Sequence, residues 1–300
     1  MTGTTEDRHS LSSGRLSATI QAKGAELSSL RGADGRDYLW QAGPAWPRHS
    51  PVLFPIVGRL AEDRYTHAGQ TYRLTQHGFA RDLPFTWLSR SEAACALVLE
   101  DDAESRALYP YRFRLVLSYE LAGTTLTLRY TLTNKGDDPM PAALGAHPAF
   151  AWPILPDVPK EEHELRFARA EQAPIHGVAN GLLTAAVHPS PVEDRVLPLR
   201  TELFDADALV FTSLESRSVR FSGRGTPVLE VAWEGFEQLG VWTKPGGSGD
   251  FLCIEPWHGY ASPEGFTGDL LEKPGIMILP PGTEREMQWS VSLLPAECGT

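Results

Sequence analysis

The chain has 300 residues, 42% of them hydrophobic, with a formal charge of −11 and a pI near 5.3. A chain of this size can bury a large core without metals or disulfides, so we expect it to fold on its own. Its acidic balance, with no run of Lys and Arg, disfavours nucleic acid and anionic membranes as partners.

The cysteines and the N-terminus indicate the compartment. Cys95, Cys253 and Cys298 are few and form no CxxC pair, which disfavours a disulfide framework or a zinc knuckle and is typical of a reducing compartment. The first residues lack the apolar segment of a signal peptide, and no run of eighteen apolar residues occurs. We expect a cytoplasmic protein without a membrane segment, with a frayed tail at residues 1–14 and a single domain over residues 15–300.

Alternating apolar and polar residues predict strands along most of the chain. The alternation is clearest in residues 111–121 (YRFRLVLSYEL) and 125–134 (TLTLRYTLTN), which read together as an antiparallel hairpin. In chain order the predicted strands are residues 15–22, 94–100, 111–121, 125–134, 208–211, 227–233, 239–243, 251–255 and 284–294. Helical turns are expected at residues 104–109 and 262–266, and exposed loops at residues 153–160 and 189–194. The pattern, punctuated by 27 Gly and 24 Pro, predicts an all-β sandwich or barrel.

Some segments depart from this alternation and contain unusual polar residues. They are His49–Leu60 (HSPVLFPIVGRL), Gln76–Asp82 (QHGFARD), Leu144–Phe150 (LGAHPAF) and Cys253–Gly259 (CIEPWHG). Glu255 ends a predicted hydrophobic strand, and a buried carboxylate must be hydrogen-bonded or functional because leaving it unpaired is costly. His77, His147 and Arg59 are candidate partners. Together these groups supply the base, acid and cation that proton transfer at neutral pH requires.

Each of these residues also has a purely structural explanation when it is taken singly. A histidine before Pro or Gly is commonly a loop residue bonded to backbone, Arg59 can pair with Glu62 or Asp63, and Trp257 can belong to the core. No HxH, HxxxH or HExxH spacing is present, so no metal site is predicted. GxSxG, P-loop and GxGxxG motifs are missing as well. Acid–base chemistry or plain binding is what the residues support.

The four segments, in this order and at these separations, resemble the aldose 1-epimerase (galactose mutarotase-like) superfamily, specifically its shorter bacterial members with HGFAR and EPW motifs. The resemblance spans most of the chain, from GAELSSL at residues 24–30 to the turn at residues 280–282. It implies a large antiparallel β-sandwich of galactose mutarotase type with an open sugar cleft, in agreement with the strand pattern. It also implies interconversion of the α and β anomers of an aldohexose, with no cofactor.

The resemblance assigns roles to individual residues. Glu255 matches the general base, His147 the general acid and His77 a second active-site histidine. Arg59 matches an arginine that holds sugar oxygens.

The other matches concern substrate binding. The family's hydroxyl-binding aspartate has its counterpart in Asp207, with Asp205 as a rival. Trp257 is expected to line the cleft, because the C–H faces of sugars stack on aromatic rings.

The sequence leaves the substrate open. Related members of the superfamily act on hexose 6-phosphates, and Arg81 together with Arg59 is a candidate for binding a phosphate. The alternative for Arg81 is a surface ion pair with Asp82. A carbohydrate-binding or sensing protein without turnover is another alternative, which the intact acid and base disfavour. A glycoside hydrolase would need two carboxylates at the bond. The sequence is compatible with a monomer or a homodimer.

Overall fold

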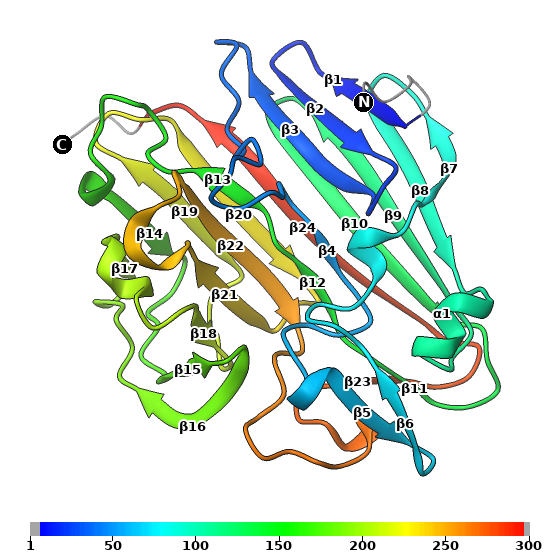
Figure 1. Cartoon of the computed structure of the whole chain (residues 1–300). Helices are drawn as coiled ribbons and strands as arrows, with labels where there is room; N and C mark the ends of the chain where they lie inside the picture. Colours follow the sequence, from blue (N-terminus) through cyan, green and yellow to red (C-terminus); the bar gives the residue numbers. More distant parts are fainter. Residues whose placement is uncertain (1–6, 297–300) are drawn as a thin grey trace.

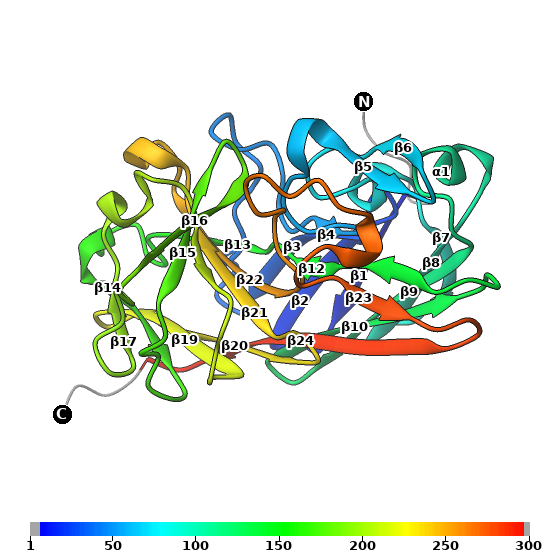
Figure 2. The same cartoon turned by 90° about the horizontal axis from the view of Figure 1, so that it is seen from below.

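The computed structural model describes residues 7–296 as a set of antiparallel sheets packed in layers (Figures 1 and 2). The nine-stranded sheet has the order β17 (Val196–Pro198), β14 (His163–Phe167), β19 (Ser218–Gly223), β20 (Val228–Glu234), β24 (Glu284–Leu294), β10 (Thr125–Asn134), β9 (Phe113–Ala122), β8 (Ala94–Glu100) and β7 (Thr86–Arg90). The eight-stranded sheet has the order β16 (Leu182–His188), β15 (Ile175–Ala179), β18 (Leu209–Phe211), β21 (Gln238–Trp242), β22 (Phe251–His258), β12 (Leu144–Ala146) and β4 (Val52–Leu53), and β13 (Ala149–Ala151) also pairs with β22. The all-β antiparallel sandwich that the sequence predicts is therefore confirmed.

Smaller elements surround the two large sheets. A three-stranded sheet contains β1 (Arg8–Ser12), β2 (Leu16–Gln21) and β3 (Glu26–Gly32). The hairpin of β5 (Arg64–His67) and β6 (Gln70–Arg73) forms one two-stranded sheet, and the sequence-distant strands β11 (Met140–Ala142) and β23 (Met277–Leu279) form another. The helical elements are α1 (Ala103–Leu108) and the 3₁₀ turns Ala61–Asp63, Ala80–Asp82, Lys160–Glu162, Thr201–Phe204, Pro245–Gly247 and Leu270–Glu272. In the described part of the chain, none of these helices has the length and hydropathy that a membrane span needs.

Several predicted elements agree closely with the structure, and two need correction. Strands β8, β10 and β24 occupy the predicted ranges, and α1 forms at the predicted turn, where the Asp102 side chain caps the Ser105 N–H. Residues 262–266, in contrast, contain no helical turn. The predicted frayed tail is also wrong from Arg8 onward, because Arg8–Ser12 pairs with β2 as β1. Residues 1–6 of that tail lie outside the described residues.

Strand β22 is longer than the sequence indicates, so that Glu255 lies inside it and not at its end. A proline in a central strand normally breaks the ladder because it has no N–H. Here Ile254 N donates to Pro148 O at 3.3 Å, so residue 256, two positions on, faces the same edge. On that edge the register sets Pro256 across from Ala146 at the end of β12, next to the break between β12 and β13.

The two faces of β22 have different environments. Leu252 and Ile254 point into the main core between the two large sheets, which is built from aliphatic and aromatic side chains. The alternate residues, Cys253, Glu255 and Trp257, point to the opposite face. The strand therefore anchors the sheet with one face and supplies the floor of a cavity with the other.

Two glycines allow Trp257 to lie flat across this floor. A Cβ at Gly240 on β21 would stand 2.3 Å from the Trp257 ring, and one at Gly145 on β12 would stand 2.8 Å from it. Glycine at these positions thus makes room for the indole between the flanking strands.

We predict that Gly240→Ala destabilises the protein by about 1–3 kcal/mol, because the added methyl group overlaps the indole of Trp257. Equilibrium urea unfolding measures the change. Gly136→Ala is the matched control, since a Cβ there meets nothing closer than the Asn134 oxygen at 3.4 Å. Equal stability of the two variants would contradict the packing described here.

Candidate active site

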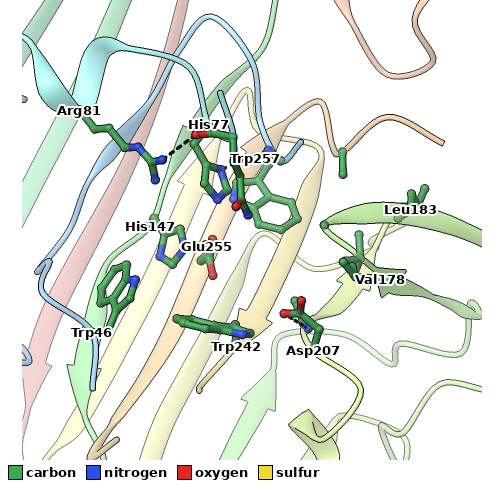
Figure 3. Close-up of a pocket in the computed structure, with 16 residues that line it drawn as sticks. Trp46, His77, Arg81, His147, Val178, Leu183, Asp207, Trp242, Glu255 and Trp257 are labelled. Carbon is green, nitrogen blue, oxygen red and sulfur yellow. Dashed lines mark hydrogen bonds and ion pairs between the residues drawn. The ribbon is translucent and has the colours of Figure 1, made fainter. Parts of the chain in front are cut away.

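A cavity of about 330 Å³ lies on the face of the eight-stranded sheet that is turned away from the main core (Figure 3). Its walls come from loops after β3 and β4, from the β15–β16 hairpin and from the segment after β22. The residues that line it are Trp46, Gly58, Gln76, His77, Arg81, His147, Val178, Gly181, Leu183, Asp207, Ala208, Val210, Trp242, Glu255, Trp257 and Ala261.

The floor of the cavity contains a contact between His147 and Glu255. Strands β12 and β13 pair with β22 in one common register, with Gly145 opposite Trp257 and Ala149 opposite Cys253. This register puts His147 directly across from Glu255, and residues opposite each other project to the same face of a sheet. His147 Nε2 lies 3.2 Å from Glu255 Oε2. Backbone pairing between strands far apart in sequence therefore brings the two groups together.

Burial controls the charge state of this pair. Glu255 is 1% exposed, and desolvation raises the pKa of its carboxyl well above the usual value, with a further increase from the nearby charge of Asp207. Desolvation also lowers the pKa of His147 to about 3, and the cations Arg81 and Arg48 act in the same direction. Both effects disfavour charge, so over a wide range of pH the pair holds one titratable proton, on the Glu255 carboxyl, beside a neutral imidazole.

His77 contributes a fixed hydrogen-bond donor. Its Nδ1 accepts from the Gly58 N–H at 3.2 Å, so the neutral ring has its proton on Nε2. Burial lowers the pKa of His77 well below 6.5, and His147 is the next contributor. The two rings meet edge to face with centroids 5.5 Å apart. His77 is therefore a neutral donor beside the pair at neutral pH.

Aromatic rings enclose the catalytic candidates on one side. Trp46 stacks on His147 with ring centroids 4.9 Å apart, and Trp242 meets the same histidine edge to face at 5.9 Å. The Trp46 loop is held in place by a bond from Trp40 Nε1 to Trp46 O at 2.7 Å. The Glu26 carboxylate accepts two further backbone N–H groups of this loop. These rings restrict the orientation of His147 and keep water away from it.

Arg81 lies at the rim of the cavity as part of a charged cluster. Its Nη2 donates to Gln76 O at 2.6 Å, and its Nε lies 3.7 Å from Asp82, which also pairs with Arg48 at 2.9 Å. Burial lowers the pKa of Arg81 to about 10, with Arg48 as the next cause. The Asp82 pair expected from the sequence is present, yet Arg81 still faces the cavity (Figure 3).

The structure separates the two candidate aspartates. Asp207 lines the cavity on the side opposite Trp46, with a φ of 83° and a bond from the Ala208 N–H to its Oδ1 at 2.9 Å (Figure 3). Desolvation raises the pKa of Asp207. Asp205 is exposed and is not among the lining residues.

Arg59 is placed differently from the other predicted residues. It is not among the residues that line the cavity, and its side chain is 41% exposed. Its guanidinium pairs with Asp63, with Nε 2.8 Å and Nη2 3.3 Å from the carboxylate oxygens, and Nη1 donates to Asn180 O at 3.4 Å. Arg59 therefore connects the β4 segment to the tip of the β15–β16 hairpin.

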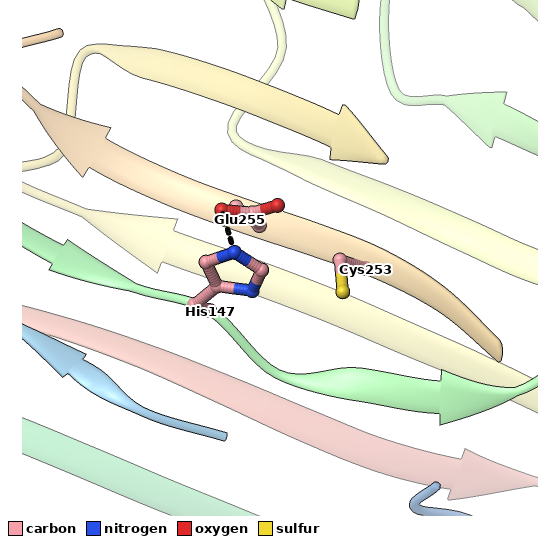
Figure 4. Close-up of side chains that lie close together, drawn as sticks. All are labelled: His147, Cys253 and Glu255. Carbon is pink, nitrogen blue, oxygen red and sulfur yellow. Dashed lines mark ion pairs between the residues drawn. The ribbon is translucent and has the colours of Figure 1, made fainter. Parts of the chain in front are cut away.

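The sequence did not point to Trp46 and Trp242 as site residues. Trp46 stands in a loop without alternation, and Trp242 follows the ordinary pattern of a strand, so neither has a local signal. Of the residues predicted from the sequence, six line the cavity: Glu255, His147, His77, Asp207, Trp257 and Arg81. Cys253 lies beside the histidine and the carboxylate (Figure 4) and is a further candidate ligand for a metal ion.

Comparisons with known proteins extend over nearly the whole chain. A model of the aldose 1-epimerase family matches residues 7–267. Protein LacX of Lactococcus lactis, in its plasmid and chromosomal forms, is 32% identical and covers 92% of this chain and 96% of its own length. The structure of a galactose mutarotase related enzyme from Lactobacillus acidophilus has a TM-score of 0.92 at 30% identity, covering 97% of this chain and 100% of that chain. A galactose mutarotase-like protein from Lactobacillus casei has a TM-score of 0.90 at 27% identity, with 95% and 99% covered.

We predict that His147 stays neutral from pH 8 down to pH 5, because burial lowers its pKa to about 3. Imidazole nitrogen shifts in two-dimensional ¹H–¹⁵N spectra, assigned with a His147→Gln variant, measure its protonation. The unfolded chain binds this proton near pH 6.5, so the buried ring lowers stability progressively as the pH falls from about 6.5 toward 3. A titration midpoint near 6.5 in the folded protein would contradict this account.

Proposed function

Because the chain belongs to the aldose 1-epimerase family, we propose that it interconverts the α and β anomers of a free aldohexose by opening and closing the sugar ring. The observation that supports this most directly is the buried contact of 3.2 Å between His147 and Glu255 on the floor of a cavity of sugar size. Such a pair can add a proton to one oxygen of a hemiacetal while removing a proton from another.

In the proposed reaction, Glu255 removes the proton from the hydroxyl group at the anomeric carbon. His147 gives a proton to the ring oxygen, the bond between that oxygen and the anomeric carbon breaks, and the free aldehyde forms. Rotation about the adjacent carbon–carbon bond presents the other face of the aldehyde, and the ring closes with both proton transfers reversed.

The proton count of the pair fits this cycle. One proton moves from His147 to Glu255 through the sugar during opening and returns during closing, so no proton has to come from solvent. In the free protein this proton is on Glu255, and the reaction begins from the sugar complex in which it is on His147, so that His147 is an imidazolium and Glu255 a carboxylate. Hydrogen bonds from sugar hydroxyls to this carboxylate favour that state.

The residues around the pair have supporting roles in the proposal. The Nε2–H of His77 stabilises negative charge that develops on oxygen during opening. Asp207 accepts hydrogen bonds from sugar hydroxyls at the other side of the cavity, and the indole of Trp257 offers an apolar surface to the C–H face of the sugar. Arg59 can bind a sugar oxygen, as the resemblance implies, only if its ion pair with Asp63 breaks.

We predict that Glu255→Gln lowers turnover by at least about 100-fold, because the amide cannot act as a base. Sugar binding should change little, since the shape of the side chain is conserved. Polarimetry and exchange NMR on freshly dissolved α-glucose and α-galactose measure the rate above the uncatalysed reaction.

Glu237→Gln is the matched control, because Glu237 is exposed and lies outside the cavity lining. Near-normal turnover of Glu255→Gln would contradict the assignment of the base. Saturable sugar binding by the wild-type protein without acceleration of any sugar would contradict the enzyme and favour a sugar-binding protein.

A hexose 6-phosphate is the second candidate substrate, and the charged rim favours it. Arg81 faces the cavity, the charge of Arg48 lowers its pKa, and its Nε, 3.7 Å from Asp82, has no hydrogen bond among the described residues. A guanidinium with a free N–H is suited to a phosphate oxygen.

If the substrate is a sugar phosphate, Arg81→Ala will reduce kcat/KM for glucose 6-phosphate far more than for glucose, because the lost cation contacts the phosphate alone. Polarimetry with both sugars gives the two ratios. Arg129→Ala, on the nine-stranded sheet, controls for the loss of a positive charge. Equal effects of Arg81→Ala on the two sugars would remove the phosphate candidate.

A further inference from the structure

Cys253 has no part in the proposed reaction, but its thiol lies next to the two groups that do. One ligand atom each of His147, Cys253 and Glu255 lies within 4.8 Å of the others, and all three residues are buried. Figure 4 shows the cysteine and the glutamate on β22, with the histidine ring facing them from the link between β12 and β13.

The sheet fixes this arrangement. Cys253 and Glu255 are two residues apart on one strand and therefore project to the same side, while His147 is across from Glu255 in register. Trp46 and Trp242 pack around the cysteine and stack on or against the histidine. The three side chains therefore keep their relative positions without a ligand.

The group contains buried polar atoms that the protein leaves unpartnered. Glu255 Oε2 touches His147 Nε2 outside hydrogen-bond geometry, and neither Glu255 Oε2 nor His147 Nδ1 has a hydrogen bond among the described residues. Cys253 is free of any disulfide. Buried polar atoms normally have partners, so unpartnered ones beside a cavity indicate a place for a ligand.

We propose that His147, Cys253 and Glu255 form an inhibitory site for Zn²⁺ and similar divalent transition metals. An imidazole nitrogen, a thiolate and a carboxylate are the donors that zinc takes, and three protein ligands with one open position are typical of an accessible zinc site. Bonds of roughly 2.0–2.3 Å place tetrahedral donors about 3.5 Å apart, a separation that small side-chain rotations provide here. His147 and Glu255 line the cavity, so a metal ion held between them would have room for a water molecule as its fourth ligand.

Charge balance favours the metal in this dry site. The carboxyl of Glu255 and the thiol of Cys253 release their protons to solvent when Zn²⁺ binds, and His147 binds as a neutral ring. Two negative ligands cancel the charge of the cation, so the group is neutral before and after binding. The desolvation that raises the pKa of both acids is thus not an obstacle to the complex, because the cation replaces their protons.

The metal would occupy the base and the acid at once. Zinc is therefore expected to inhibit competitively with sugar, a consequence that rests on the proposed function. Metal binding itself does not depend on turnover and is measured separately.

The first test is a Co²⁺ titration of the full chain, followed by absorption. A cobalt–thiolate charge-transfer band in the near ultraviolet should appear, and Zn²⁺ should displace it. Cys253→Ser should lose the band and weaken Co²⁺ binding by at least about tenfold. Cys95→Ser and Cys298→Ser, which keep Cys253, should behave like the wild type. Cys253→Ala gives the same comparison if the serine variant does not fold.

The second test uses anomer exchange with Zn²⁺ or Mg²⁺ present. Zn²⁺ should slow the wild type but not Cys253→Ser, which keeps the acid and the base, and Mg²⁺ should affect neither. A wild type without the cobalt band, or a Cys253→Ser variant that binds Co²⁺ as tightly as the wild type, would overturn the site. If a saturating concentration of sugar does not weaken Co²⁺ binding, the proposal that metal and sugar compete for one site is wrong. Cobalt binding in a protein that exchanges no anomers would refute the enzyme and leave the metal site standing.

Discussion

The common register of β12, β13 and β22 is the constraint on which the site depends. It sets His147 across from Glu255 on one face of a sheet whose other face is packed in the main core. Because backbone hydrogen bonds and core packing hold the strands, the distance between the two groups is built into the fold. Pro256 stands in β22 across from the last residue of β12, next to the break at His147 and Pro148.

Burial gives this contact its chemical character. A carboxyl and an imidazole in water would both be charged at slightly acidic pH, but the covered floor disfavours the charged form of each. The pair consequently holds a single titratable proton, and in the proposed reaction one sugar oxygen gains a proton while another loses one. His77, held by the Gly58 N–H as a donor, supplies polarity without adding charge.

The same sheet geometry explains the cysteine beside the pair. A residue two positions before Glu255 must share its face, so a thiol at position 253 is brought to the candidate catalytic groups whatever its role. The aromatic rings that shield His147 also cover this thiol. The same shielded surface thus serves proton transfer in the proposed reaction and offers three donor atoms to Zn²⁺ in the proposed metal site.

The sequence by itself predicted the strands, because the alternation of apolar and polar residues shows which face of a strand is buried. It also pointed to most of the candidate site residues, because Glu255, His147 and His77 stand in the four motifs. It could not set Trp46 or Cys253 beside His147, since these contacts arise from loop packing and from the pairing of strands that are far apart in sequence. Asp205 and Asp207 look alike in sequence, and only the turn before β18 decided that Asp207 faces the cavity. The local pair of Arg59 with Asp63 was one of the alternatives that the sequence offered, whereas the bond from Arg59 to Asn180 depends on a hairpin tip from a remote part of the chain. The alternation along a strand depends on which of its own side chains are apolar and become buried. Contacts between distant residues depend instead on which strands and loops become neighbours in the folded chain.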